Sequence, residues 1–198
     1  MSSSDSAPEP TMERSTREKL WGPQASVSEI DEHGGERSAL YLQAIAALEA
    51  RDLGLAWELF MQLRARHPDD PASYVCLGTV ALQSEDTARA AEMYRHAMRL
   101  DPKSVGAHFG FGSLYHQTGH YREAIQWFES ALELRPDLVD LHYNLALTWE
   151  KLRDYDSMRR HAAIVVERDP ESANGLSARR LLQMNGVARW LRRFVPWL

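Results

Sequence analysis

Histidine and cysteine are the residues of this sequence best suited to chemistry, because their side chains act as general bases, nucleophiles and metal ligands. The chain has eight histidines and one cysteine. His116 and His120 are four residues apart, a spacing that would place them on one side of a helix, but a turn is predicted between them. No cysteine or carboxylate pair completes a tetrahedral metal site with them. Cys76 has no arginine, lysine or histidine at helical spacing to lower its pKa. We therefore expect no metal centre and no reactive thiol.

Sequence motifs of the common enzyme classes are also missing. The chain contains no Walker loop, no dinucleotide-binding glycine fingerprint, no nucleophile elbow and no HExxH pair. His108 and His142 take equivalent places in a repeated pattern, and we interpret them as packing residues rather than ligands. The sequence thus predicts a protein that is not an enzyme and that needs no cofactor.

The composition is that of a globular protein. Of 198 residues, 44% are hydrophobic and 26% are charged, which excludes a wholly disordered chain, a collagen-like fibre and a disulfide-stapled miniprotein. No window approaches the roughly 18 consecutive apolar residues of a membrane-spanning helix, and the polar N-terminal stretch does not resemble a signal peptide. Because one cysteine cannot form an internal disulfide, we expect a cytoplasmic location.

Charge is distributed unevenly along the chain. Residues 1–36 carry eight acids and three bases, whereas residues 173–198 carry five arginines and no acid. The net charge is −5, which argues against nucleic acid as a partner. The acidic start and the basic end need separate explanations.

One repeating interval dominates the sequence. Prolines recur at equal spacing at Pro68, Pro102, Pro136 and Pro170. At the same interval, small residues stand at Ala44, Gly78, Gly112 and Ala146, and aromatic residues at Phe60, Tyr94 and Phe128. A period of about 34 residues is typical of helical hairpin repeats. Four units in one register without an insertion are hard to obtain by chance, so the chain is predicted to be a repeat protein.

Each unit has the spacing of two helices joined by a turn. In the third unit Ala124, Phe128 and Ala131 lie at i, i+4 and i+7, which is one face of a helix. Gly119 lies in the turn that precedes this helix. The proline near the end of the unit stops the helix, because it lacks an N–H and disfavours helical geometry in the residue before it.

These positions resemble the tetratricopeptide repeat family, with units at 37–70, 71–104, 105–138 and 139–172. The second unit matches at Tyr74, Leu77, Gly78, Ala81, Ala90, Tyr94, Ala97 and Pro102. The third matches at His108, Phe111, Gly112, Tyr115, Ala124, Phe128, Ala131 and Pro136. The resemblance extends from position 37 to position 172 and implies an all-α, right-handed superhelical solenoid of helical hairpins. In the first unit, Gln43 replaces an apolar residue, as an end unit allows.

Packing requirements explain the repeated residue types. Gly78 and Gly112 are expected to let the two helices of a hairpin approach closely, while Tyr94 and Phe128 fill the space between neighbouring hairpins. A single hairpin cannot bury its apolar face alone, so the units must stack.

The resemblance also implies that the first helix of each unit lines a concave groove. The predicted partner-binding residues are Tyr41, Ile45, Val75, Thr79, Phe109, Ser113, His116, Tyr143, Leu147 and Lys151. This strip is mostly apolar and aromatic, which suits an apolar or amphipathic segment of another protein. The alternative is that its aromatic residues are buried between repeats or covered by the protein's own tails.

A clamp for acidic chaperone C-termini is excluded. Family members with that function hold the carboxylate with lysine, arginine and asparagine in the groove. The matching places here are Tyr41, Ile45, Cys76, Gly106 and Gly110, which carry no positive charge.

The C-terminal region is predicted to contain two segments. Ser172 is a candidate N-cap for a capping helix over 173–186, which Gly186 is expected to break. Residues 187–198 form a short basic amphipathic tail whose contact residues are Arg189, Trp190, Leu191, Arg192, Arg193, Phe194 and Trp197. This tail fits three alternatives, which are packing against the solenoid, contact with a partner or a second copy, and weak binding to an anionic membrane surface.

Residues 1–36 are predicted to be a largely disordered leader, because they are rich in serine, proline and acids. Their apolar islands, Leu20-Trp21 and Val27 to Ile30, are either docking motifs or part of a solvated leader. We predict a protein–protein interaction module that acts as a scaffold, assembly factor or chaperone-like adaptor, with self-association as a further expectation. The alternative is a membrane-peripheral assembly factor that is anchored by its C-terminal helix.

Overall fold

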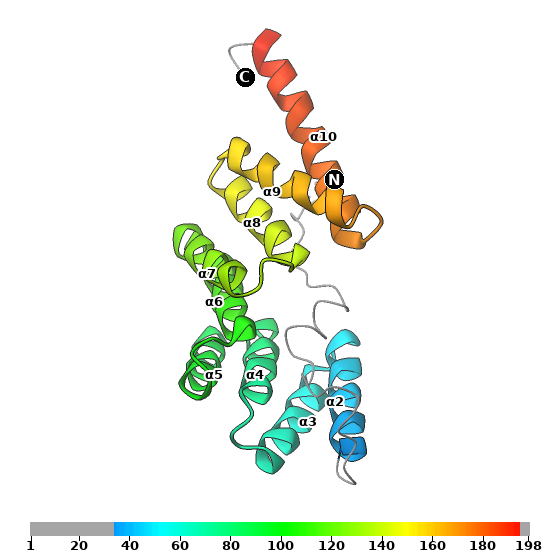
Figure 1. Ribbon diagram of the computed structural model, residues 1–198, viewed down its shortest axis with the longest axis vertical. Coiled ribbons are helices and arrows are strands. Elements are labelled where there is room, and N and C mark those ends of the chain that lie inside the picture. The colour runs from blue at the N-terminus through cyan, green and yellow to red at the C-terminus, as the bar shows by residue number, and fades with distance from the viewer. Residues whose placement is uncertain (1–33, 195–198) are drawn as a thin grey trace, which may run out of the picture.

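The computed structural model describes the backbone of residues 34–194 and the side chains of residues 39–183. Every secondary-structure element in this part of the chain is a helix. The helices are α2 (Gly34–Glu49), α3 (Leu53–Arg66), α4 (Pro71–Gln83), α5 (Thr87–Leu100), α6 (Val105–Gln117), α7 (Tyr121–Leu134), α8 (Val139–Lys151), α9 (Tyr155–Arg168) and α10 (Ala173–Phe194). The first eight form four hairpins that stack along the long axis, and α10 follows the last of them (Figure 1). The all-α repeat architecture is therefore confirmed.

The helix ends follow the sequence repeat. The second helices of the hairpins end at Arg66, Leu100, Leu134 and Arg168, in each case just before the repeated proline. Most helices also begin with an acidic or hydroxyl side chain that accepts a hydrogen bond from a backbone N–H of the first turn. Ser172 is confirmed as such a cap, because its Oγ accepts from the Gly175 N–H at 2.9 Å.

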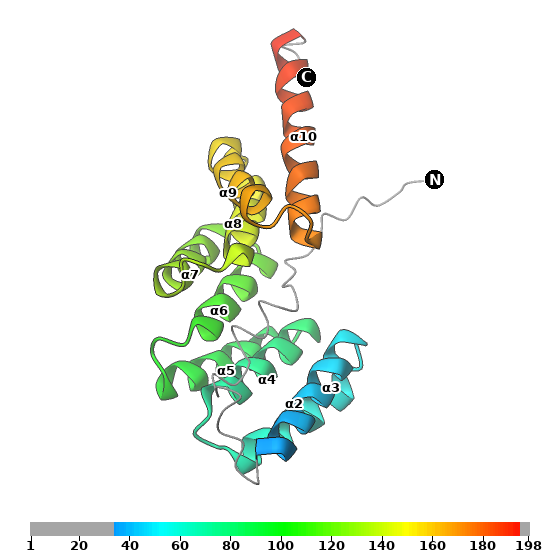
Figure 2. The same ribbon diagram turned by 45° about the vertical axis from the view of Figure 1, so that its right-hand side comes forward.

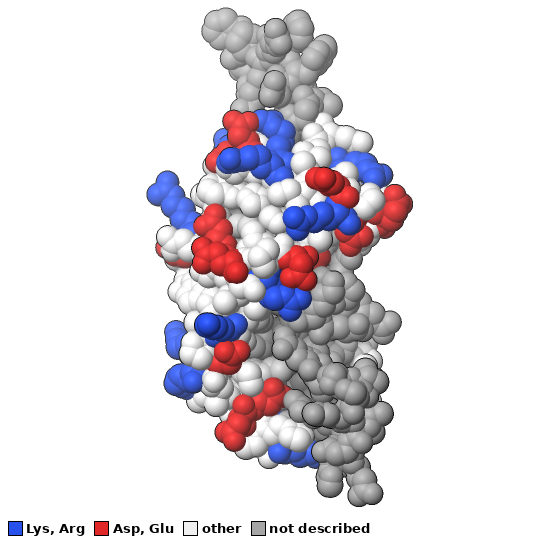
Figure 3. Space-filling view, viewed as in Figure 1, with Lys and Arg blue, Asp and Glu red and all other residues white. Residues whose placement is uncertain are grey.

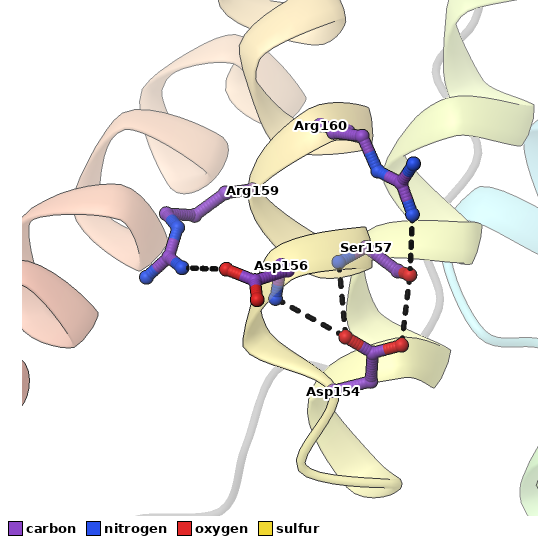
Figure 4. Close-up of polar contacts among 5 residues, drawn as sticks. All are labelled: Asp154, Asp156, Ser157, Arg159 and Arg160. Carbon is purple, nitrogen blue, oxygen red and sulfur yellow. Dashed lines mark hydrogen bonds and ion pairs between the residues drawn. The ribbon is translucent and has the colours of Figure 1, made fainter.

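The start of α9 shows how such a cap is built (Figure 4). Asp154 Oδ1 accepts hydrogen bonds from the backbone N–H groups of Asp156 at 3.2 Å and Ser157 at 3.1 Å. Its Oδ2 accepts from the Ser157 hydroxyl at 2.8 Å, and Arg160 donates to that same hydroxyl at 2.9 Å. These donors stabilise the carboxylate and lower the pKa of Asp154. Arg159 and Asp156 form an ion pair beside the cap.

The turns within the hairpins share one backbone conformation. Gly119 has a φ of 81°, and the equivalent residues of the other hairpins also have positive φ values, 59° at Arg51, 62° at Glu85 and 59° at Arg153. This left-handed conformation costs an L-residue about 1–2 kcal/mol relative to the right-handed one, and glycine escapes that cost. Only the third hairpin therefore uses the residue that the turn favours.

Close contact between helices depends on the small residues, as the sequence predicts. A Cβ added at Gly78 would lie 2.5 Å from the Tyr94 ring, and one at Gly112 would lie 2.5 Å from the Phe128 ring. Phe128 is completely buried, and Tyr94 is 1% exposed. Tyr94 also approaches the next hairpin, because a Cβ at Gly110 would lie 2.4 Å from its ring.

The sequence prediction of a helix break at Gly186 is wrong. Helix α10 continues from Ala173 through Gly186 to Phe194. One glycine inside a helix costs about 1 kcal/mol relative to alanine, which does not by itself end a helix, whereas a proline costs about 3 kcal/mol. In both Figure 1 and Figure 2 the C-terminal half of α10 extends past α9, with no other described helix beside it.

Candidate partner-binding face

The first helices of the hairpins form one side of the stack. Helix α4 contacts α6, α6 contacts α8, and α8 contacts α10. Contacts of this extent between the second helices of successive hairpins do not occur in the described part of the chain. A stack that is tighter on one side curves toward that side, so α4, α6 and α8 lie on its inner face.

The predicted groove residues differ widely in exposure. Val75, Phe109, His116, Tyr143 and Leu147 are buried, with exposed fractions of 1%, 6%, 7%, 1% and 3%. The half-buried members are Tyr41, Ile45, Thr79 and Ser113, and Lys151 is exposed. Only this second group offers side-chain surface to a partner.

Contacts with neighbouring helices account for the buried aromatic residues. The ring of Phe109 lies 5.6 Å from that of Phe128, measured between centroids. Tyr143 packs in a cluster with Met158 of α9 and Ala178 of α10. Burial raises the pKa of Tyr143 above its usual value. Both rings thus serve the packing of the solenoid.

His116 is held by a hydrogen bond between the third and fourth hairpins. Its Nδ1 lies 2.9 Å from Thr148 Oγ1, and that hydroxyl donates its only proton to the carbonyl oxygen of Asn144 at 2.6 Å. The Nδ1 atom must therefore carry the proton of the neutral imidazole and donate it to Thr148. Burial, and to a lesser degree the positive charge of Lys151, lowers the pKa of His116 from 6.5 to about 4.

The half-buried residues Thr79 and Tyr41 contact buried residues of the solenoid. Thr79 donates from Oγ1 to the Val75 carbonyl oxygen at 3.1 Å and lies 3.4 Å from the Tyr94 hydroxyl. Tyr41 packs against the hydrophobic core that contains the Cys76 thiol, and Cys76 is 1% exposed. Burial raises the pKa of that thiol far above its usual value, so Cys76 is an unreactive packing residue.

Two polar pairs near the C-terminal end, one buried and one partly buried, were not predicted from the sequence. Asn174 of α10 donates from Nδ2 to Asp140 Oδ1 at 2.8 Å, and the two side chains are only 2% and 3% exposed. In the second pair, His142 Nδ1 lies 3.0 Å from His161 Nδ1. The first pair could have been predicted from the repeat, because positions 140 and 174 are separated by one repeat interval.

The histidine pair offers two nitrogen atoms to a metal ion, which is fewer than a structural zinc site needs. In the described residues no group of three or more histidine, cysteine, aspartate or glutamate side chains converges. Burial lowers the pKa of both His142 and His161, to about 4 for His142.

The predicted tail and leader fall largely outside the described residues. The backbone of Arg189 to Phe194 is helical and belongs to α10, but the side chains of these residues lie outside the described part, as does all of Trp197. Residues 1–33 of the leader also lie outside it. None of the helices in residues 34–194 combines the length and the hydropathy that crossing a bilayer requires.

Charge does not single out a site on the one face that Figure 3 shows. On the face seen in Figure 3, the described basic and acidic side chains are interspersed. The first-helix face is characterised by its half-buried apolar and hydroxyl residues.

Comparison with protein families matches the chain to two models of one repeat family. A model described as a tetratricopeptide repeat matches residues 41–102, and one described as a TPR repeat matches residues 112–152. Together they span more than half of the chain. No curated protein sequence matches it.

Solved structures with this fold include several repeat proteins. A thermophilic TPR protein of Thermus thermophilus superposes with a TM-score of 0.66 at 22% identity, covering 74% of this chain and 81% of its own. YrrB, described as a TPR protein with an unusual peptide-binding site, gives 0.56 at 20% identity and covers 77% of both chains. The O-GlcNAc transferase of Thermobaculum terrenum gives 0.61 at 24% identity over 70% of this chain, which spans only 27% of the transferase. The hairpin register, the packing of its glycines and aromatic rings, and these matches agree that the chain belongs to the tetratricopeptide repeat family.

Proposed function

We propose that the protein is an interaction scaffold that binds an apolar or amphipathic segment of another protein along the first-helix face. The observation that carries this proposal is the row of half-buried side chains that successive first helices contribute, Tyr41 and Ile45 from α2, Thr79 from α4 and Ser113 from α6. Half-buried apolar contact area beside the Ser113 hydroxyl suits a peptide whose backbone also needs a hydrogen-bond partner. Assembly and chaperone-like holding are both served by such a surface.

Burial decides which residues can test the proposal. Truncating Phe109 or Tyr143 would open cavities in the core, so a loss of binding would report unfolding as much as a lost contact. Ser113→Glu instead adds a charge to a half-buried position on α6. Gln126→Glu adds the same charge to the exposed side of α7 in the same hairpin and is the matched control.

The experiment uses peptides selected from a random display library against the full-length chain. Fluorescence anisotropy then measures the dissociation constants of the selected peptides for the wild type and both variants. We expect Ser113→Glu to weaken binding of apolar peptides at least tenfold and Gln126→Glu to leave it unchanged. Equal affinities for all three chains, or selection of purely polar peptides, would refute binding at this face.

A membrane-peripheral role is a second candidate, and the length of α10 favours it. A 22-residue helix that is anchored on the fourth hairpin offers more amphipathic length than the short tail over 187–198 that the sequence predicted. The residues beyond Gly186 include three arginines and no acid, which suits an anionic surface. Cosedimentation with phosphatidylglycerol vesicles tests this role. Binding should fall when Arg189, Arg192 and Arg193 become glutamine, and equal pelleting of both proteins would exclude it.

A further inference from the structure

Each hairpin after the first uses one strip of its first helix to contact the hairpin before it. On α6, Gly110 lies directly against Tyr94 of the second hairpin, and the ring of Phe111 lies 5.6 Å from the Tyr94 ring. On α8, Thr148 is bonded to His116 of the third hairpin at 2.9 Å. The sixth, seventh and tenth positions of a unit are therefore inter-hairpin contact positions.

The same strip on α2 has no described hairpin before it. Its members are Ala39, Leu42, Gln43 and Ala46, which occupy the third, sixth, seventh and tenth positions of the first unit. All four are exposed, and Leu42 is 62% exposed. At the sixth position of the second and fourth units, Cys76 is 1% exposed and Asn144 is fully buried. We call these four residues the α2 end strip.

The α2 end strip is only partly polar, although the outer face of a terminal repeat is in contact with water. A terminal repeat normally turns a polar face to water. Gln43 supplies a polar side chain at a position where the later units have the apolar residues Leu77, Phe111 and Leu145. Leu42, in contrast, is a large apolar side chain at a position where the residues of the later hairpins are buried. The strip thus has the character of a contact surface.

We propose that the α2 end strip is the docking site for residues 20–30 of the same chain. The leader joins α2 at Gly34, at one end of the strip. Its apolar islands are Leu20-Trp21 and Val27 to Ile30. At about 3.3 Å per extended residue, the chain from Gly34 back to Ile30 can span about 13 Å, and the chain from Gly34 back to Leu20 can span about 46 Å. Helix α2 is about 24 Å long, so the two islands together can reach every part of the strip.

Tethering favours this occupant over a separate molecule. A short flexible connection gives the attached segment an effective concentration of order millimolar. A second copy or a partner at micromolar concentration would need about a thousandfold higher intrinsic affinity to displace it. Because the strip faces the end of the stack rather than its inner face, the docked leader leaves Thr79 and Ser113 accessible, and the inference stands independently of the proposed function.

Cross-linking of the full-length protein tests the proposal directly. A chain with Gln43→Cys and Gln24→Cys, which keeps Leu42 and both apolar islands, is treated with a short bismaleimide after mixing unlabelled and ¹⁵N-labelled protein, while native Cys76 is buried and protected. Leu100→Cys with Gln24→Cys is the control, since Leu100 is an exposed leucine on α5. We expect cross-links within single chains at least fivefold more abundant than in the control. Equal yields in both proteins would overturn the proposal, and mixed-isotope products would show that a second copy occupies the strip instead.

Hydrogen exchange supplies a readout that does not depend on introduced cysteines. Trp21→Ser with Ile30→Ser should speed amide exchange in α2 about threefold to tenfold and leave α6 unchanged. Adding Leu42→Ser to these changes should have no further effect on α2, because the contact is already lost. Unchanged exchange in α2, or an equal increase in α6, would contradict docking at this strip.

Discussion

The Nδ1 atom of His116 donates a hydrogen bond to the Thr148 hydroxyl across the junction of the third and fourth hairpins. Thr148 in turn donates to the Asn144 carbonyl oxygen, which leaves the hydroxyl no proton to offer the imidazole. The hydrogen bond thus fixes the proton on Nδ1, and burial, which lowers the pKa of His116, keeps the imidazole neutral. A second proton on His116 would create a buried cation near Lys151.

The first prediction is that the protein loses stability in mild acid. The folded state lowers the pKa of His116 and of His142 from 6.5 to about 4, and that of His161 also falls. Between these pH values the unfolded chain binds more protons than the folded one, so the stabilisation is complete above about pH 6.5 and is lost as the pH falls toward 4. The loss from His116 should be on the order of 2 kcal/mol. Urea unfolding at several pH values measures it.

His116→Gln provides the check on that assignment. The variant lacks the titrating imidazole, so its unfolding free energy should fall less steeply between pH 6.5 and 4 than that of the wild type. A slope equal to that of the wild type would show that the acid sensitivity arises at other groups.

The second prediction concerns the turn residues with positive φ. Glu85→Gly should raise the free energy of unfolding by about 0.5–1 kcal/mol, because glycine removes the left-handed strain but adds entropy to the unfolded chain. The matched reverse change is Gly119→Ala. A Cβ at Gly119 meets no atom within 4 Å, so any destabilisation of this variant reports backbone conformation alone. Thermal unfolding of both variants tests the sign, and a destabilised Glu85→Gly would contradict it.

The third prediction is that the contact of Gly110 with Tyr94 does not tolerate a methyl group. An added Cβ would lie 2.4 Å from the Tyr94 ring, which is itself 1% exposed and cannot move away. Gly110→Ala should therefore cost about 1–3 kcal/mol, although alanine is the better helix former. Gly54→Ala is the control, since its nearest neighbour would be Asp52 Oδ1 at an ordinary 3.7 Å. Equal stability of the two variants by urea unfolding would rule out the steric argument.

The repeat made much of the fold predictable from the sequence. The prolines located the ends of the second helices, and Gly78 and Gly112 marked the close approaches to Tyr94 and Phe128. These features recur from unit to unit, so the copies reinforce one local pattern. The left-handed turns, such as the one at Glu85, were not evident, because glutamate and arginine do not favour that conformation.

The exposure of the binding face could not be predicted in the same way. Phe109 and Tyr143 share the fifth position of their units with Tyr41, yet only Tyr41 is half-buried. The difference arises from tertiary neighbours, since Tyr143 is covered partly by α10. The sequence predicted a separate capping helix over residues 173–186, whereas in the structure one continuous helix, α10, includes these residues and the first part of the tail. Periodicity assigns a residue to a face, but the helices packed on that face decide how much of it remains open.

The last prediction is that the hydrogen bond from Asn174 to Asp140 fixes α10 to the fourth hairpin. Asn174→Ala removes a donor from a carboxylate that is 3% exposed, which should cost about 1–3 kcal/mol. The effect should be local, so hydrogen exchange should accelerate in α10 and leave α4 and α5 unchanged. Gln183→Ala, an exposed change on the same helix, should leave exchange in α10 as it is in the wild type. If Asn174→Ala accelerates exchange no more than Gln183→Ala, the apolar cluster around Tyr143 holds α10 without help from the polar pair.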